Sequence, residues 1–463
     1  MTGSIIKSAW KDQVASSEFI RLYKKQGLAR DALRMWNKEV FGNCQNKINS
    51  LLQAIKEIQQ GPPLENSGAV EDALQTELSE WLLRSETLWR QKSRELWLKL
   101  GDKNTKFFHL FTIIRRKRNN IDAIRDKQGA WITETEAIRS LFLNSFKNLF
   151  KQEEVNFPTH LEHLALSCIT EDENDELSRI PTPEEIKATL FNMQDLKAPG
   201  PDGYPVIFHK QLWPTVGDDV IKAVTSFFRI ESMPREVNNS LIVLIPKISN
   251  PTSVQHFRPI SLCNVVYKII SKLLVAKLRP HLDKIISPTQ SAFIPNRWIA
   301  ENQVIVQEMF HSFKTCKTKP GLMAIKLDLQ KAYDRMSWDF IHTVLLHLGF
   351  NEVFSSWVLS CISSVTFEIL VNGGKTEKFR PSRGLRQGDP LSPYLFILGQ
   401  EILSRMLDHE LRQSSIKGIK TSKSGLTITY VMYADDIVLF SKATKRDAET
   451  ISEILKKYSR WSG

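Results

Sequence analysis

Residues 427–440, TITYVMYADDIVLF, decide the fold. Apolar, β-branched and aromatic residues dominate both halves of this stretch, which is typical of strands. The acidic pair Asp435 and Asp436 stands between the halves, so the pattern predicts two strands joined at Ala434-Asp435-Asp436. Burying a carboxylate without a partner costs several kcal/mol, so two carboxylates in apolar sequence need a physical reason.

A third carboxylate lies in similar surroundings upstream. Residues 323–329, MAIKLDL, alternate between apolar residues and a face that carries Lys326 and Asp328, which predicts a strand. Three converging carboxylates repel one another unless a cation lies between them, and oxygen ligands suit Mg²⁺ or Mn²⁺. Two such ions about 3.5–4 Å apart stabilise the attacking and leaving oxygens of phosphoryl transfer. These residues equally allow a polar turn at Asp435-Asp436 and an ion pair between Asp328 and a lysine.

Composition limits the class of protein. The 463 residues include 63 Lys and Arg against 51 Asp and Glu, a formal net charge of +12. This length predicts about two to four domains. A hydrophobic content of 42% excludes a wholly disordered chain. The basic surplus indicates either a polyanionic partner such as nucleic acid or a basic surface without such a partner.

Cysteine spacing and apolar runs indicate the compartment. No two of the five cysteines lie within four residues of each other, which argues against a zinc knuckle and against any disulfide partner. The first residues lack the apolar core of a secretory signal. No apolar run reaches the roughly 18–20 residues that a membrane-spanning helix needs. We expect a soluble, intracellular protein without a membrane partner.

Residues 1–150 are expected to form a helical, basic N-terminal extension, with a linker at 61–68 (GPPLENSG). Ten Lys and Arg lie between Arg90 and Arg118, interleaved with aromatic residues. Such a segment fits either a nucleic-acid groove or a solvated basic helix whose aromatics belong to the core. Residues 151–180 are acidic and predict an exposed, irregular connection.

Residues 181–463 mix strands and helices, which predicts an α+β fold. The patterns predict a strand at 240–248, a helix from Ser261 to His281, and a hairpin around Asn372-Gly373-Gly374. A long helix running to about Arg412 is expected to be capped by Asp389, with Pro390 near its first position.

Several of these segments together resemble reverse transcriptases. YADD at 433–436 looks like their active-site hairpin, AIKLDLQKAYDRMSW (324–338) like their first carboxylate motif, and SRGLRQGDPLSPYLF (382–396) like the loop and helix between them. Upstream, KAPGPDG (197–203), LIPK (244–247), FRPISL (257–262) and QSAFIPNR (290–297) are similar to the fingers segments of non-LTR retrotransposon enzymes. The stretch 93–121 also reads like the LINE-type elements of plants, so the likeness spans residues from about 80 to 463.

The resemblance implies a role for each matching residue. Asp328, Asp435 and Asp436 match the catalytic metal ligands, together with the main-chain carbonyl of Leu329. Tyr333 matches the residue that senses the sugar 2′ carbon and disfavours ribonucleotides. The remaining candidates match positions that contact the incoming nucleotide, the template or the triphosphate: Gly384, Gln387, Gly388, Arg258 and Lys247.

The resemblance implies a right-hand polymerase palm and fingers at 181–463, with the helical extension in front. The implied activity is RNA-directed DNA polymerisation with Mg²⁺ (or Mn²⁺), and the implied partners are template RNA, primer DNA and dNTPs. We expect a nuclear location. Nothing in the chain resembles the family's endonuclease or thumb, so we expect a chain truncated at both ends that binds template but extends a primer poorly or not at all.

Two other interpretations remain open at this point. An RNA-binding remnant of a retroelement would keep the fingers and the basic stretch without turnover. An organellar intron maturase would share the polymerase fold but would be expected to begin with a transit-type segment, which the first residues do not convincingly resemble.

Overall fold

The computed structural model describes residues 2–11, 16–62, 67–93, 105–153, 161, 164, 167–315, 319–420 and 426–463. The chain forms two compact units. The first comprises Met1–Asp122 with Gln194–Ala198 and Pro205–Gly217, and the second comprises Ala123–Met193, Pro199–Tyr204 and Asp218–Gly463.

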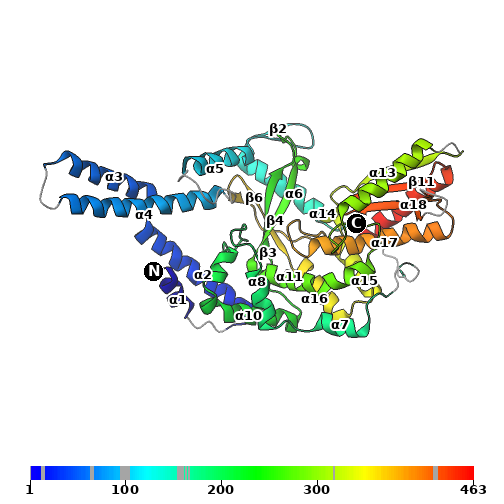
Figure 1. The fold of residues 1–463 in the computed structure, drawn as a ribbon, viewed down its shortest axis with the longest axis horizontal. Helices are drawn as coiled ribbons and strands as arrows, with labels where there is room; N and C mark the ends of the chain where they lie inside the picture. Colours follow the sequence, from blue (N-terminus) through cyan, green and yellow to red (C-terminus); the bar gives the residue numbers. More distant parts are fainter. Residues whose placement is uncertain are drawn as a thin grey trace. The chain divides into compact units, whose positions relative to one another are not determined.

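The first unit is helical. Its described elements are α1 (Thr2–Trp10), α2 (Glu18–Trp36), the π-helix η1 (Asn37–Phe41), α3 (Cys44–Gln60), α4 (Ser67–Ser93), α5 (Thr105–Asn119) and α9 (Val206–Gln211). Helices α3 and α4 lie side by side as a helical hairpin (Figure 1). Cys44, Ile48, Leu51 and Trp81 are buried between them, because these apolar residues recur on one face of each helix. Apart from α9, the described helices of this unit lie between Thr2 and Asn119.

A mixed sheet organises one part of the second unit. Its strand order is β4 (Phe257–Cys263), β3 (Asn239–Pro246), β6 (Thr366–Val371) and β7 (Gly374–Lys375). Strands β3 and β4 are antiparallel, whereas β3 and β6 are parallel. The turn at Asn372 and Gly373, where both residues have positive φ, joins β6 to β7 as the hairpin pattern predicts.

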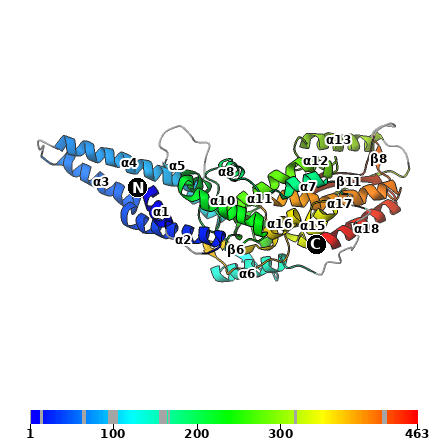
Figure 2. The same ribbon diagram turned by 90° about the horizontal axis from the view of Figure 1, so that it is seen from below.

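A three-stranded antiparallel sheet forms the second part, in the order β10 (Tyr430–Tyr433), β11 (Asp436–Lys442) and β5 (Leu322–Asp328). Helix α13 (Ile299–Thr315) covers one face, where its Met309 packs on Val431 and Phe440. Helices α17 (Ser392–Arg412) and α18 (Lys445–Ser462) lie on the other face (Figure 2). Both faces of the sheet are covered by helices, so the strands are largely apolar except at the end that carries Asp328 and Asp436.

The remaining elements of the second unit connect and cover these sheets. They are β1 (Ile124–Arg125), β2 (Trp131–Ile132), α6 (Thr135–Leu149), α7 (Glu171–Ser178), α8 (Pro183–Phe191), α10 (Trp213–Ile230, shared with the first unit), η2 (Val254–His256), α11 (Val265–Leu278), η3 (Arg279–His281), α12 (Leu282–Ile285), α14 (Ala332–Arg335), α15 (Trp338–His347), α16 (Glu352–Ser363), β8 (Ile419–Lys420) and β9 (Thr427–Ile428).

Two expected boundaries in this unit are wrong. Residues 123–150 belong to it and not to the helical extension, because Phe142 stacks edge-on against Phe257 and Phe150 packs against Phe367. Strand β4 continues to Cys263, so no helix begins at Ser261; pairing with β3 overrides the local helical pattern there.

Two further expectations differ from the structure. The acidic stretch at 151–180, expected to be irregular, contains the helix α7 among its described residues. Thr170 and Glu173 form a reciprocal capping box at the start of this helix. Helix α17 begins at Ser392, so Pro393 and not Pro390 lies in its first turn, and Asp389 stays outside the helix, where its Oδ1 accepts the N–H of Leu391 at 3.0 Å.

The four cysteines within the described ranges form no disulfide with one another. In the same ranges, no helix is both long and apolar enough to cross a membrane.

Candidate active site

Two separated acidic segments meet at one end of the three-stranded sheet. Strand β5 ends at Asp328 and strand β11 begins at Asp436, and the two residues are direct partners in the β5–β11 ladder. Tyr433 pairs with Asp436 across the β10–β11 hairpin, so Ala434 and Asp435 form its two-residue turn. Opposite residues in an antiparallel pair share a face, so Asp328 and Asp436 point to the same side of the sheet. That side is also the one that α13 covers farther along the strands.

Asp328 and Asp435 both line a cavity of about 610 Å³. Its other walls come from α6, η2, strand β4, the segment after β5, the loop that carries Gln387 and the start of α17. Of the residues that the resemblance singles out, the cavity is lined by Lys247, Arg258, Asp328, Leu329, Tyr333, Gln387, Gly388 and Asp435. Gly384 and Asp436 are not part of this lining. The sheets and the loops thus bring residues from distant segments to one hollow.

The three carboxylates are exposed, which differs from the burial that the apolar strands suggest. They lie where the strands end, so their charges keep access to water. The side chain of Asp436 lies 3.7 Å from Nζ of Lys326, with both groups more than two thirds exposed. Among the described residues, no group of three or more His, Cys, Asp or Glu side chains is arranged to hold one metal ion. Asp328 and Asp435 remain as two carboxylates facing one cavity, a donor set of hard oxygens that suits a divalent cation.

The loop of residues 384–388 approaches this cavity through close backbone contacts. Gly384 and Gly388 have φ values of +101° and +105°, a region that favours glycine. A Cβ atom at Gly384 would lie 2.6 Å from the carbonyl oxygen of Asp334, and one at Gly388 would lie 2.9 Å from that of Ser261. The N–H of Ser261 donates to the carbonyl of Gln387 at 2.7 Å. These glycines therefore allow the loop to lie against β4 and the segment after β5.

Asp334 is a site residue that the sequence reasoning missed. It lines the cavity, it is 3% exposed, and its Oδ1 accepts a hydrogen bond from Nε2 of Gln387 at 3.1 Å. Burial raises the pKa of the Asp334 carboxyl to about 6, although the Gln387 amide and the charges of Lys331 and Lys247 favour its ionised form. Its position directly after Tyr333 in KAYDR, within a motif already singled out, was the available signal.

Tyr333 packs with its ring stacked on Phe396 of α17, with the ring centroids 4.4 Å apart. Burial raises the pKa of the Tyr333 hydroxyl, and the negative charge of Asp435 raises it further. The main-chain carbonyl of Tyr333 accepts the N–H of Leu385 at 2.7 Å, which fastens it to the same glycine loop. One face of the ring is held by Phe396, and the residue borders the cavity.

Positive charge also lines the cavity. Lys247, Arg258 and Lys331 all contribute to its walls. Lys247 follows β3 and Arg258 lies on the neighbouring strand β4. Lys331 is partly buried with a left-handed backbone (φ 55°), and burial lowers its pKa. Carboxylates and cations around one hollow form a site that can bind a metal ion together with a phosphate group.

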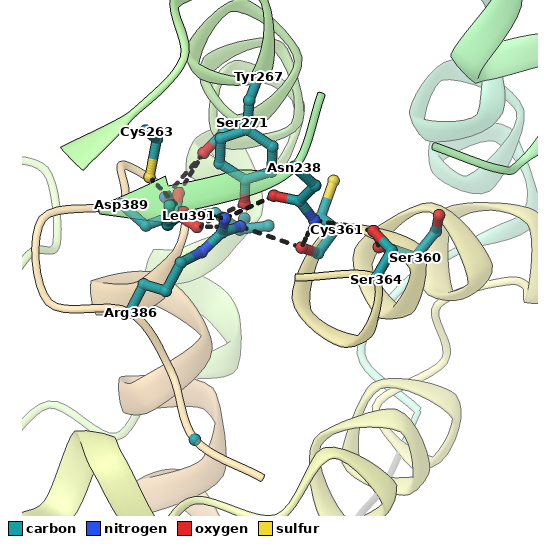
Figure 3. Close-up of polar contacts among 12 residues, drawn as sticks. Asn238, Cys263, Tyr267, Ser271, Ser360, Cys361, Ser364, Arg386, Asp389 and Leu391 are labelled. Atoms are coloured by element: carbon teal, nitrogen blue, oxygen red, sulfur yellow. Dashed lines mark hydrogen bonds and ion pairs between the residues drawn. The ribbon is translucent and has the colours of Figure 1, made fainter. Parts of the chain in front are cut away.

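A buried ion pair anchors the loop that carries Gln387 (Figure 3). Arg386 lies 3.0 Å from Asp389 and its guanidinium stacks 3.9 Å from the centre of the Tyr267 ring. Asp389 accepts hydrogen bonds from the hydroxyls of Tyr267 and Ser271. Arg386 also donates to Asn238, to Ser240 and to the carbonyl of Cys361. The residues on both sides of Gln387-Gly388 are thus fixed to β3, α11 and α16.

The basic segment of the N-terminal unit is only partly described. Arg94, Lys99 and Lys103 lie outside the described residues, as does Trp97. Arg115–Arg118 lie exposed at the end of α5, and Arg115 donates to the carbonyl of Ser93 at 2.8 Å. Phe108 is buried, whereas Phe107 and Phe111 are partly exposed and stack on each other. The charges at the end of α5 therefore form an exposed surface, and the aromatic residues divide between core and surface.

The part of the chain that holds the cavity matches a known protein family. Residues 245–463 match the family model described as "Reverse transcriptase (RNA-dependent DNA polymerase)". All of the cavity residues that the resemblance names lie within this range.

Three relatives illustrate the breadth of the similarity. The uncharacterized 149 kDa protein of transposon TX1 from Xenopus laevis is 25% identical over 454 residues, which are 94% of this chain and 34% of the relative. The Pol polyprotein of retrotransposable element R2DM from Drosophila melanogaster is 27% identical over 344 residues, 71% of this chain and 31% of the relative. The RNA-directed DNA polymerase from mobile element jockey of Drosophila funebris is 21% identical over 371 residues, 77% and 38% respectively. The chain spans about a third of the length of these relatives.

Proposed function

We propose that this chain carries the palm and fingers of an RNA-directed DNA polymerase from a non-LTR retrotransposon, because residues 245–463 match the reverse transcriptase family and the relatives are retrotransposon proteins. The observation that supports it most is the single cavity that Asp328, Asp435, Tyr333 and Gln387 share with basic residues. These residues come from separate segments, and an unrelated fold has no reason to collect them. The three-stranded sheet corresponds to the palm and the β4-β3-β6-β7 sheet to the fingers.

Reverse transcriptases use divalent metal ions, and Mg²⁺ is the ion we propose here. Asp328 and Asp435 would hold it, with the main-chain carbonyl of Leu329 as a further oxygen ligand. Bound there, the ion would lower the pKa of a primer 3′-hydroxyl and neutralise charge on a triphosphate. Asp436 stands beside this pair and is engaged with Lys326, which supports an accessory role.

The chain's own residues would place the substrates. Lys247, Arg258 and Lys331 supply the positive charge that a dNTP triphosphate requires. The Tyr333 ring, held by Phe396, is placed to contact the sugar and to disfavour a 2′-hydroxyl. Gln387 would contact the nucleotide or template base, with its side chain oriented by Asp334. We propose template RNA and primer DNA as the macromolecular partners, and a nuclear location stays a prediction.

A single-turnover experiment tests the proposal even if turnover is slow. The chain, in excess, is mixed with a DNA primer annealed to an RNA template, one dNTP at a time, and Mg²⁺. We expect addition of the nucleotide that the template base specifies, and loss of this addition on chelation of the metal. Asp435→Asn should abolish it, whereas Asp339→Asn, at an exposed position of α15 outside the cavity, should not. Addition that ignores the template, or that survives Asp435→Asn, would contradict the proposal.

A further inference from the structure

The segment before α13 is fastened along β10, beside the acidic turn. The N–H of Met432 donates to the carbonyl of Thr289 at 2.9 Å, and the N–H of Ser291 donates to the carbonyl of Met432 at 3.2 Å. Asn302 on α13 donates its side-chain amide to the same two carbonyls, of Thr289 and Met432. Gln290 is therefore held at the end of the palm sheet, as a parallel bridge partner of Met432.

The Gln290 side chain lies fully buried and reaches the turn itself. Its Oε1 accepts the N–H of Ala434 at 3.0 Å and the N–H of Ala292 at 3.0 Å. Its Nε2 donates to Oε1 of Gln400 on α17 at 3.2 Å. Because two N–H groups require an acceptor, the carbonyl end of the amide must face the turn and the NH₂ end must face Gln400.

The backbone of Ala434 requires a hydrogen-bond partner that holds its conformation. It has a left-handed backbone, with φ of 51°, that L side chains rarely adopt, and it is buried immediately before Asp435. A strained conformation of this kind persists only when its surroundings fix it. The N–H that Gln290 accepts belongs to the Tyr433–Ala434 peptide, so this bond holds the peptide plane that precedes the left-handed Ala434 and from which the chain turns to Asp435.

We propose that Gln290 is a positioning residue that fixes the acidic turn and so directs the carboxylate of Asp435 into the cavity with Asp328. The side chain of Gln400 fixes the orientation of the Gln290 amide. Helix α17, which follows the loop that carries Gln387, thus also carries the residue that orients Gln290. This inference rests on the proposed function, but the bond from Ala434 to Gln290 can be measured without any activity.

The matched pair of variants is Gln290→Met and Asn302→Leu. Both remove buried side-chain hydrogen bonds next to Met432, but only Gln290 touches the turn. Amide hydrogen exchange at Ala434 measures how firmly the backbone of the turn is held. The affinity for Mn²⁺, followed by EPR, measures whether the carboxylates are placed to bind a metal ion. The midpoint of thermal unfolding measures overall stability. Gln290→Met should accelerate Ala434 exchange about tenfold and weaken Mn²⁺ binding by about tenfold or more, as the loss of an orienting partner does at other metal sites. Asn302→Leu should lower the thermal midpoint and leave Mn²⁺ affinity unchanged.

Gln290→Glu keeps the experiment informative if Gln290→Met fails to fold. A glutamate retains the acceptor oxygen, and the side-chain NH₂ of Gln400, which has no hydrogen-bond partner among the described residues, can rotate to donate to it. This variant should keep Ala434 exchange slow. Equal losses of Mn²⁺ affinity in Gln290→Met and Asn302→Leu, or unchanged Ala434 exchange in Gln290→Met, would overturn the inference. If the parent chain itself binds no Mn²⁺, the metal site of the proposed function fails, while the exchange data still decide the role of Gln290.

Discussion

Asp328 and Asp436 stand directly opposite each other across the β5–β11 ladder. The pairing fixes the register of the three-stranded sheet, because a slip of one residue would move every side chain of β5 to the other face. Asp435 then falls in the turn one residue earlier, where it reaches the same cavity as Asp328. The geometry of the site is therefore a property of strand register and does not require the carboxylates to be buried.

The Asp334 carboxyl predicts a pH dependence of stability. Its pKa is raised from an ordinary value of 3.8 to about 6, so the folded state binds this proton more tightly than the unfolded state. The associated stability is present in full below about pH 4 and is lost as pH rises through 6, a difference of roughly 3 kcal/mol at most. Asp334→Asn, which retains an acceptor for Gln387, should be more stable than the parent at pH 8. Its free energy of unfolding should lack the decrease with rising pH that Asp334 causes in the parent. Urea unfolding between about pH 4 and 8 measures it, with Asp339→Asn as the control; equal slopes in parent and Asp334→Asn would refute the assignment.

Two glycines with positive φ, Gly384 in the loop of residues 384–388 and Gly373 in the turn between β6 and β7, should differ in their tolerance of alanine. Gly373 has φ +79° with open space around it, so Gly373→Ala should cost only the backbone strain of about 1–2 kcal/mol. Gly384 combines φ +101° with a backbone oxygen 2.6 Å from the position that an alanine methyl would occupy, so Gly384→Ala should cost clearly more. Urea denaturation compares the free energies of unfolding. Equal losses in the two variants would mean that the loop can move away from Asp334.

The Arg386–Asp389 pair predicts a large loss of stability. Removing one partner of a buried ion pair leaves an uncompensated charge and typically costs about 3–5 kcal/mol. Arg386→Met should lose an amount in this range, since Asp389 is fully buried. Lys326→Met breaks the exposed pair with Asp436 and should cost less than about 1 kcal/mol. If Arg386→Met proves as stable as Lys326→Met, the cluster in Figure 3 does not anchor the loop.

The basic end of α5 predicts RNA binding that depends on salt and not on sequence. Reversing Arg115–Arg118 to Glu should remove most of the affinity and reduce the slope of log K against log salt by about 3. Fluorescence anisotropy with two unrelated single-stranded RNAs measures both quantities. The control reverses four basic residues of α1, α2 and η1, which changes the net charge equally: Lys7, Lys24, Arg34 and Lys38. Similar losses in both variants would show that net charge alone attracts the RNA.

The local patterns of the sequence predicted the β10–β11 hairpin, β5 and the Asn372-Gly373 hairpin, because alternating apolar residues and turn residues specify them directly. Asp389 was expected to cap the long helix, and its Oδ1 does accept the N–H of Leu391 just before α17. Its carboxylate also pairs with Arg386 and accepts two hydroxyls, partners that no local pattern reveals. Asp334 and Gln290 were missed for the same reason, since each acquires its role from a residue distant in sequence. The roles of the cavity residues themselves stay predictions.

Asp328 and Asp435 are proposed to act together at one nucleotidyl-transfer site. The most direct test is the single-turnover rate constant of RNA-templated nucleotide addition for Asp328→Asn, Asp435→Asn and the double variant. Residues that act as a unit are strongly non-additive, so each single change should lower the rate by about 10² or more and the double change should lower it little further. A parent-like rate in either single variant, or losses that multiply in the double variant, would contradict a shared site.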